Sequence, residues 1–204
     1  MNRTTITVEQ ARGLILASAK NDVRYYLQGA LIDFEAGRAV STDGHCLLAI
    51  NIETSVVDPA YGSAIVPRDA LEQISKAGSK FDTVEIAYGP DGVTLARSSG
   101  LQITVPAING RFPDYRRVIP ESISGEPAQF DPDLMARICK ALRLAVDAGP
   151  KACTYVEYNG TSSALVSVKG CSEQAIAVCM PWRAESDGNS AISIFFASKE
   201  SKAA

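Results

Sequence analysis

The stretch AIVPRDALEQI, residues 64–74, passes from a short apolar strand pattern through a proline into a helix pattern, and AQFDPDLMARI, residues 128–138, has the same order. Pro67 and Pro132 each stand where a helix begins, a position that suits proline because the first helical N–H has no partner there. Asp131 adds a side chain that is favoured at a helix N-cap. Two matching junctions of strand and helix predict an internal repeat.

Strand patterns joined by turn residues follow each junction, and a third copy of the same order precedes them. That copy opens with an extended TITV and a helix from about residue 9 to residue 20. The strands are predicted at 23–35, 38–42 and 46–53 in the first unit, 83–88, 93–97 and 101–106 in the second, and 154–158, 164–168 and 175–180 in the third. Three units of one strand, one helix and three strands predict an α+β fold with antiparallel hairpins and helices on one face.

The chain has 204 residues, enough for one large domain or two small ones. The run 119–127 holds two prolines, a glycine and two glutamates, so it is the best linker candidate. We therefore predict one domain over residues 1–120 and a second, partial one over 121–204. The second ends in a polar tail that carries a strand-like AISIFF at 191–196.

The composition excludes several classes of protein. Hydrophobic residues make up 46% and charged residues 21%, which is ordinary for a soluble domain. No apolar run reaches the roughly 18 residues that a membrane helix needs, and the N-terminus lacks the apolar core of a signal peptide, so we expect a cytoplasmic protein without membrane contact. A net charge of −3 argues against DNA binding by bulk charge but leaves room for one basic face.

The sequence offers little for catalysis, metal or cofactor binding. The five cysteines are irregularly spaced, with no CxxC pair that would indicate a zinc site or disulfide framework. His45, the only histidine, adjoins Cys46, and neighbours on a strand point to opposite faces. Asp43 and His45 could share a face, but two ligands do not make a metal site. We predict no enzyme activity and no cofactor; a thiol enzyme is the one catalytic alternative, supported only by the number of cysteines.

Three segments carry a resemblance to a known family: NDVRYYLQGALIDFE with STDGHCLLAI (21–35 and 41–50), NGRFPDYRRVIP (109–120) and VCMPWR (178–183). In this order they resemble the beta subunit of bacterial DNA polymerase III, the sliding clamp. The resemblance implies a DNA-clamp fold, in which a subunit has three domains of two units each and dimers close a ring around duplex DNA. Here the first two units resemble the middle domain and the third resembles the second half of the C-terminal domain. Ring closure is therefore in doubt, because the usual dimer interface joins the first and last domains.

The resemblance also implies a cleft that captures peptide motifs of polymerases and the clamp loader. The matching positions are Leu27, Thr42, Gly44, His45, Leu47, Pro113, Arg117, Val118, Val178, Met180, Pro181, Trp182 and Arg183. Cys46 stands where the family often has arginine, and Trp182 where it often has methionine, so peptide preference is expected to differ. The competing interpretation is that the apolar members are ordinary core.

In the clamp fold the helices face DNA, and the predicted helices carry more basic than acidic side chains. The candidate DNA-binding residues are Arg24, Arg68, Lys76, Lys80, Arg137, Lys140 and Arg143. Two interpretations stay open: phosphate contacts without sequence reading, or bases placed near helix ends to suit the helix dipole. Arg24 can equally face the cleft.

Two functions follow from these expectations. The first is a processivity factor for DNA replication that encloses DNA as a homo-oligomer, since a lone half-domain would expose apolar surface. The alternative is a clamp-derived adaptor or decoy that binds partner peptides without encircling DNA.

Overall fold

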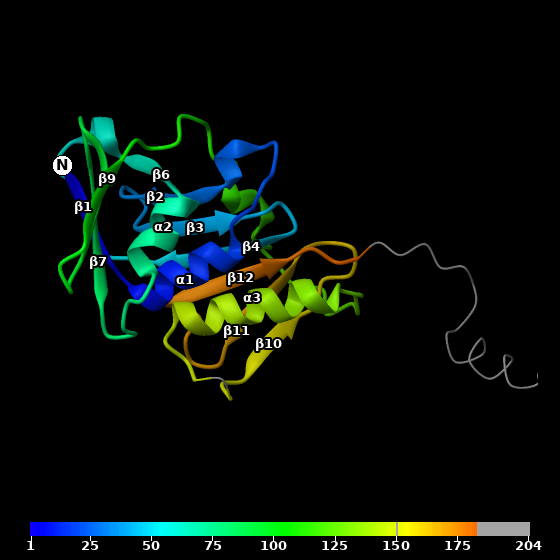
Figure 1. Ribbon diagram of the computed structural model, residues 1–204. Helices are drawn as coiled ribbons and strands as arrows, with labels where there is room; N and C mark the ends of the chain where they lie inside the picture. Colours follow the sequence, from blue (N-terminus) through cyan, green and yellow to red (C-terminus); the bar gives the residue numbers. More distant parts are fainter. Residues whose placement is uncertain (150, 183–204) are drawn as a thin grey trace, which may run out of the picture.

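The computed structural model describes residues 1–149 and 151–182, and these residues form three α-helices and two antiparallel sheets (Figure 1). The helices are α1 (Val8–Ala17), α2 (Arg68–Ser75) and α3 (Pro132–Ala145). The strands are β1 (Asn2–Thr7), β2 (Gly29–Asp33), β3 (Arg38–Thr42), β4 (Cys46–Asn51), β5 (Thr54–Ser55), β6 (Ser63–Pro67), β7 (Thr83–Gly89), β8 (Gly92–Arg97), β9 (Gln102–Val105), β10 (Thr154–Glu157), β11 (Ala164–Val168) and β12 (Ala175–Cys179). Three short 3-10 turns are η1 (Tyr25–Leu27), η2 (Pro59–Tyr61) and η3 (Tyr115–Val118). The predicted α+β class is confirmed.

The first two units exchange their opening strands. In the five-stranded sheet, ordered β5-β1-β7-β8-β9, strand β1 of the first unit pairs with β7 of the second. In the seven-stranded sheet, ordered β10-β11-β12-β4-β3-β2-β6, strand β6 of the second unit pairs with β2 of the first. The exchange interlocks the two units into one body, because neither can leave without breaking a ladder of the other.

The third unit joins this body through one strand and one helix. Strand β12 pairs with β4, from Ala175 opposite Ile50 to Cys179 opposite Cys46. Helix α3 lies beside α1 on the same face of the seven-stranded sheet (Figure 1). The two helices approach closely at Gly13, where an added Cβ would lie 2.7 Å from the carbonyl oxygen of Ala141. The sheet therefore runs without a break across the predicted boundary at residue 120.

Local chemistry explains where the helices begin. Thr7 and Gln10 form a reciprocal capping box at α1, and the Asp131 carboxylate accepts hydrogen bonds from the first backbone N–H groups of α3. Helix α3 then buries one stripe against the core, made of Ile138, Ala141, Leu142 and Ala145. The helices thus cover one face of the large sheet and leave the other to the loops.

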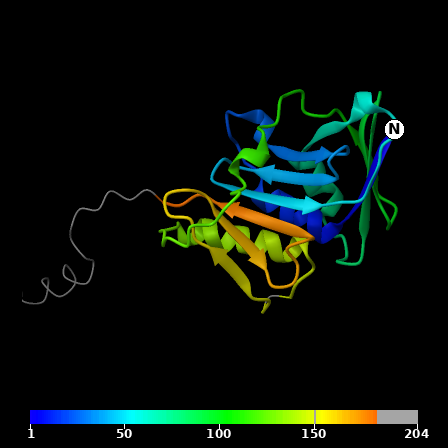
Figure 2. The ribbon, with the colours of Figure 1, turned by 180° about the vertical axis from the view of Figure 1, so that it is seen from behind.

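The opposite face of the seven-stranded sheet is covered by the segment between β9 and α3, which runs across it in Figure 2. Its Tyr115 is buried there with Leu31, Val40 and other apolar side chains of the sheet. The predicted linker is anchored to the third unit at two points, because Ser163 Oγ donates to the carbonyl of Val118 just before it (2.8 Å) and Gly125 N within it donates to the Tyr158 carbonyl (3.0 Å). The segment is a strap across both parts of the chain.

Several predicted elements end elsewhere. Helix α1 stops at Ala17 because Ser18 is extended and Asn21 has a left-handed φ of 56°. The first part of the run 23–35 is η1 instead of strand, and β2 starts only at Gly29. Residues 128–130 form no strand. Trp182 N donates to the Gln129 carbonyl at 2.6 Å, but within the described residues this contact does not extend into a ladder like the one that β6 forms with β2. The strand-like 191–196 lies outside the described residues.

Candidate functional site

An apolar cavity of about 230 Å³ lies where the third unit meets the first two. Its wall is drawn from four segments: η1, the turn between β3 and β4, the strap around η3, and the end of β12. Nine predicted cleft residues line it: Leu27, Thr42, Gly44, His45, Leu47, Pro113, Val118, Val178 and Met180. Positions up to about 150 residues apart in the sequence are thereby brought together.

The other predicted cleft residues lie elsewhere. Arg117 is 83% exposed and pairs with Asp114 at 3.2 Å. Pro181 and Trp182 line a neighbouring cavity of about 510 Å³, which shares His45 and Met180 with the first. Trp182 is 60% exposed, so its ring stands beside the apolar cavity and does not fill it. Arg183 lies outside the described residues.

Sequence reasoning missed several lining residues. They are Tyr26, Phe112, Asp114 and Tyr115. Cys46, expected to affect peptide preference, and Arg24, expected to face either DNA or the cleft, also line it. All are sequence neighbours of predicted positions, so the motifs RYYL, TDGHC and FPDYRR already contained the signal. Tyr115 closes the floor: it is buried, its hydroxyl lies 3.5 Å from Asp33 Oδ2, and burial raises its pKa above the ordinary value.

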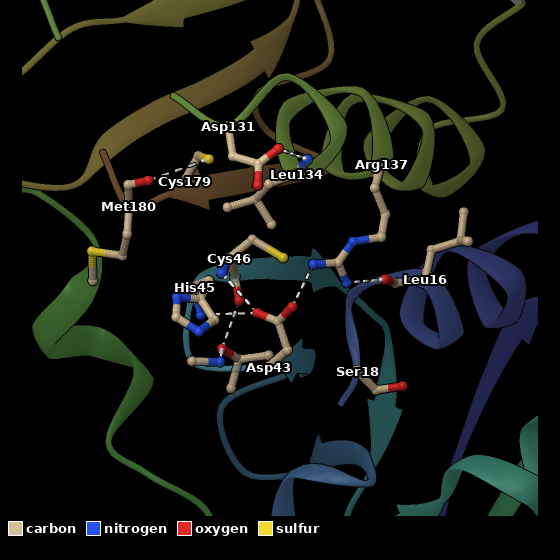
Figure 3. A network of polar contacts seen from close by, with 12 residues as sticks. Leu16, Ser18, Asp43, His45, Cys46, Asp131, Leu134, Arg137, Cys179 and Met180 are labelled. Atoms are coloured by element: carbon tan, nitrogen blue, oxygen red, sulfur yellow. Dashed lines mark hydrogen bonds and ion pairs between the residues drawn. The ribbon is translucent and has the colours of Figure 1, made fainter. Parts of the chain in front are cut away.

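The turn between β3 and β4 is held by its own side chains (Figure 3). Asp43 Oδ1 accepts hydrogen bonds from the backbone N–H groups of His45 and Cys46, each at 2.9 Å. Thr42 Oγ1 donates to the Cys46 carbonyl (2.6 Å) and accepts from Gly44 N (3.0 Å). Gly44 has a φ of 92°, which glycine adopts without the strain of a side chain. The segment TDGHC thus fixes one wall of the cavity.

Charged groups gather behind this turn. The Arg137 guanidinium of α3 contacts Asp43 Oδ2, and Arg24 Nη2 donates to the Asp43 carbonyl at 3.0 Å. Burial raises the pKa of Asp43, but the Arg137 hydrogen bond and the two backbone N–H groups outweigh it, so the pKa lies below its ordinary value of 3.8. Hydrogen bonds from Arg24 lower the pKa of Asp22 to about 2. Both carboxylates are therefore ionised at neutral pH.

The two buried cysteines of this region are poor nucleophiles. Cys46 and Cys179 face each other in the ladder between β4 and β12. Burial raises the pKa of Cys46 far above its ordinary value, and burial likewise raises that of Cys179 to about 11. Since the thiolate is the reactive form, neither suits thiol catalysis. Within residues 1–149 and 151–182 no three acidic, histidine or cysteine side chains gather as metal ligands would.

The candidate DNA-binding residues fall into two groups. Arg24, Arg68 and Arg137 are engaged in contacts within the chain; Arg68, for example, donates to Ser18 O at 3.0 Å and to Ser18 Oγ at 2.7 Å. Lys76, Lys80 and Lys140 are exposed and Arg143 is half-buried.

Among the helices of the described part, none has the length and apolar character to cross a membrane.

Comparisons with known proteins agree with this architecture. The sequence profile of the DNA polymerase III beta subunit, central domain, matches residues 6–114. The beta sliding clamp of Pseudomonas aeruginosa is 34% identical over 107 residues, 51% of this chain and 29% of that protein, and the beta sliding clamp of Vibrio cholerae is 33% identical over 129 residues, 60% of this chain and 35% of that protein. A crystal structure of the P. aeruginosa DNA polymerase III subunit beta superposes with a TM-score of 0.66 at 19% identity, covering 89% of this chain and 66% of that one.

This chain belongs to the DNA polymerase III beta subunit family, the sliding clamps, as its sequence motifs predicted. The matched region spans about a third of the length of these curated relatives. The name of these relatives and the description of the family place the family in DNA replication.

Proposed function

We propose that this protein is a clamp-type replication factor whose apolar cavity captures one or two side chains of a short peptide from a polymerase or clamp loader. The observation that carries the proposal is the cavity itself, which combines Leu27 and Leu47 of the first two units with Val178 and Met180 of the third. No catalytic step is assigned, and the setting is the cytoplasm, where replication partners occur.

The physics of the cavity suits peptide capture. Its volume of about 230 Å³ is below the roughly 300–1,000 Å³ typical of pockets for drug-sized ligands, which suits one or two side chains of a peptide. The walls are apolar, while Arg24, His45 and Asp114 supply polar groups that could orient a peptide backbone. Met180 adds an unbranched, polarisable side chain that adapts to leucine or phenylalanine anchors.

The test is binding of a fluorescently labelled ten-residue peptide that carries an adjacent Leu-Phe pair. We expect micromolar affinity, and at least tenfold weaker binding when both anchors are alanine. Met180→Glu, which places a charge in the cavity, is expected to abolish binding. Val57→Glu is the matched control, because Val57 is 71% exposed and lines neither cavity. Equal binding of the two peptides would overturn the proposal.

For DNA, we propose contacts without sequence reading through Lys76, Lys80, Lys140 and Arg143 on the helix face. Enclosing a duplex requires several copies, with residues 1–120 acting as a counterpart of the central domain and 121–204 as a partial one. Light scattering with nicked circular duplex tests this. A multi-copy assembly that stays on circles and leaves linearised DNA supports a clamp, whereas a monomer without retention contradicts it.

The alternative is an adaptor that keeps the peptide cavity and never encloses DNA. One observation favours it. The guanidinium groups of Arg24, Arg68 and Arg137 form hydrogen bonds or ion pairs within the chain, where a clamp would use them for phosphate contacts. Peptide binding together with no salt-dependent DNA binding would select the adaptor.

A further inference from the structure

Arg137 of α3 reaches from the third unit into the first two units at the joint between them. Its Nη2 donates to Asp43 Oδ2, and its Nη1 donates to the carbonyl oxygen of Leu16 at 2.9 Å (Figure 3). The pair is partly shielded from solvent, with 34% of the Arg137 side chain and 15% of the Asp43 side chain exposed. One guanidinium thus ties α3 both to the end of α1 and to the turn between β3 and β4.

Every side-chain oxygen of Asp43 has a partner in this arrangement. Oδ1 accepts from the backbone N–H groups of His45 and Cys46, and Oδ2 accepts from Arg137. The backbone carbonyl of Asp43 accepts from Arg24 Nη2. The residues on either side of Asp43, Thr42 and Gly44, line the apolar cavity, so the orientation of this carboxylate determines where that wall lies.

We propose that Arg137 and Asp43 are a positioning pair, through which docking of the third unit sets the shape of the cavity and hence its affinity for peptide. This inference rests on the proposed function. Arg137 lines the neighbouring 510 Å³ cavity and not the 230 Å³ cavity, so its effect on an anchor side chain held in the smaller cavity runs through Asp43. The same geometry assigns Arg137 a role other than the predicted DNA contact, since its guanidinium already bonds two acceptors.

The expected size of the effect follows from population arithmetic. Without the guanidinium, the Asp43 carboxylate is left unpaired at a position that is largely shielded from water. A conformation of the turn that rotates this carboxylate toward water is then favoured. If one molecule in ten then keeps the binding-competent turn, the apparent Kd rises tenfold. Such coupling through an intermediate group lies within the range seen for residues that touch neither ligand.

The experiment is a double-mutant cycle on the affinity of the labelled Leu-Phe peptide. Arg137→Met and Asp43→Asn break the same link. Arg137→Met removes the guanidinium, and Asp43→Asn keeps an acceptor for the turn but presents an N–H donor to Arg137. Each is expected to weaken binding about tenfold, and the double variant about tenfold as well, since the second change removes nothing further. Arg137→Lys, which keeps the charge without the fork, is expected to fall between wild type and Arg137→Met.

Arg3→Met is the matched control, because Arg3 forms an ion pair with Glu85 at 2.8 Å on the five-stranded sheet and lines neither cavity. Its Kd is expected within twofold of wild type. A folded Arg137→Met that binds as wild type, or a double variant near a hundredfold weaker, would overturn the positioning pair. If Arg137→Met fails to fold, Asp43→Asn and Arg137→Lys decide by the same criteria.

Hydrogen exchange without peptide separates this inference from the proposed function. Arg137→Met is expected to speed amide exchange at 43–46, with Arg3→Met unchanged there. If Arg137→Met speeds exchange at 43–46 and the wild-type protein binds no peptide, the proposed function is rejected and the pair remains a structural link. Unchanged exchange with intact wild-type binding would reject the pair alone.

Discussion

The body formed by the first two units and the third unit differ in how their strands find pairing partners. In the first two units every opening strand has a partner in the other unit, β1 on β7 and β6 on β2. In the third unit, β10 is the counterpart of β7, yet within the described residues its outer edge has no strand beside it. The third unit depends instead on β4 and α1, so its stability is tied to a neighbour.

The difference explains where the site lies. The cavity forms at the joint, because only there do η1, the turn after β3 and the end of β12 meet. A loosened third unit would therefore impair the cavity before it unfolds the rest of the chain. The following predictions probe this asymmetry, from the largest expected effect to the smallest.

Leu142→Ala and Leu71→Ala each remove a fully buried side chain, one in α3 and one in α2. Each is expected to cost about 2–5 kcal/mol of unfolding free energy. The comparison lies in the pattern of hydrogen exchange. Leu142→Ala should speed exchange only at amides of α3 and β10–β12. Leu71→Ala should speed exchange at amides of the first two units and of the third unit, because the third unit packs on the first two. The same pattern in both variants would contradict the asymmetry.

Gly13→Val tests the crossing of α1 and α3. The added Cβ would lie 2.7 Å from Ala141 O, a backbone atom that can move only with α3. We expect a cost of about 1–3 kcal/mol and weaker binding of the Leu-Phe peptide, because Val178 and Met180 shift with the third unit. Gly149→Val is the control, since no atom lies within 4 Å of its ideal Cβ position. Equal melting temperatures for the two variants would argue against a close crossing.

Acid should weaken the joint through Asp43. Its pKa is lowered in the folded chain, so its contribution to stability is complete above the ordinary value of 3.8 and is lost as pH falls through the lowered value. Denaturant titrations at neutral pH and at steps below pH 4 are expected to show wild type losing more than Asp43→Asn does, by about 1 kcal/mol once the Asp43 carboxylate is protonated. An identical loss in both proteins would mean that Asp43 adds nothing to the joint.

The smallest effect is expected for an exposed ion pair on the body. Arg3 and Glu85 are 54% and 46% exposed, so Arg3→Met should change unfolding free energy by less than about 0.5 kcal/mol. Denaturant titration measures it directly. Arg137→Met, titrated beside it, is expected to lose more, because that pair is only 34% and 15% exposed. Equal losses would show that the joint is not special among the ion pairs of the chain.

Local patterns sufficed for much of the fold. The prolines Pro67 and Pro132 and the cap at Asp131 act over a few residues, so the starts of α2 and α3 could be predicted. Residues 128–130 could not, because a strand exists only with a neighbour, and composition does not reveal which neighbours are present. The same limit hid the link from Arg137 to Asp43, whose partners stand 94 residues apart.

Most of the cavity was predicted from motif resemblance. Leu27, Leu47 and Val178 alone fit ordinary core, and only the packing of the strap against the sheet places them around a shared space. The exposure of Trp182 was beyond sequence reasoning, since it depends on where the chain leaves β12.

The central claim is that the joint between the body and the third unit is a peptide site. Hydrogen exchange with and without a saturating amount of the Leu-Phe peptide tests it most directly. The account predicts slower exchange at 42–47, 112–118 and 175–180 together, with the five-stranded sheet unchanged. Slower exchange at only one of these segments, or at none, would contradict it.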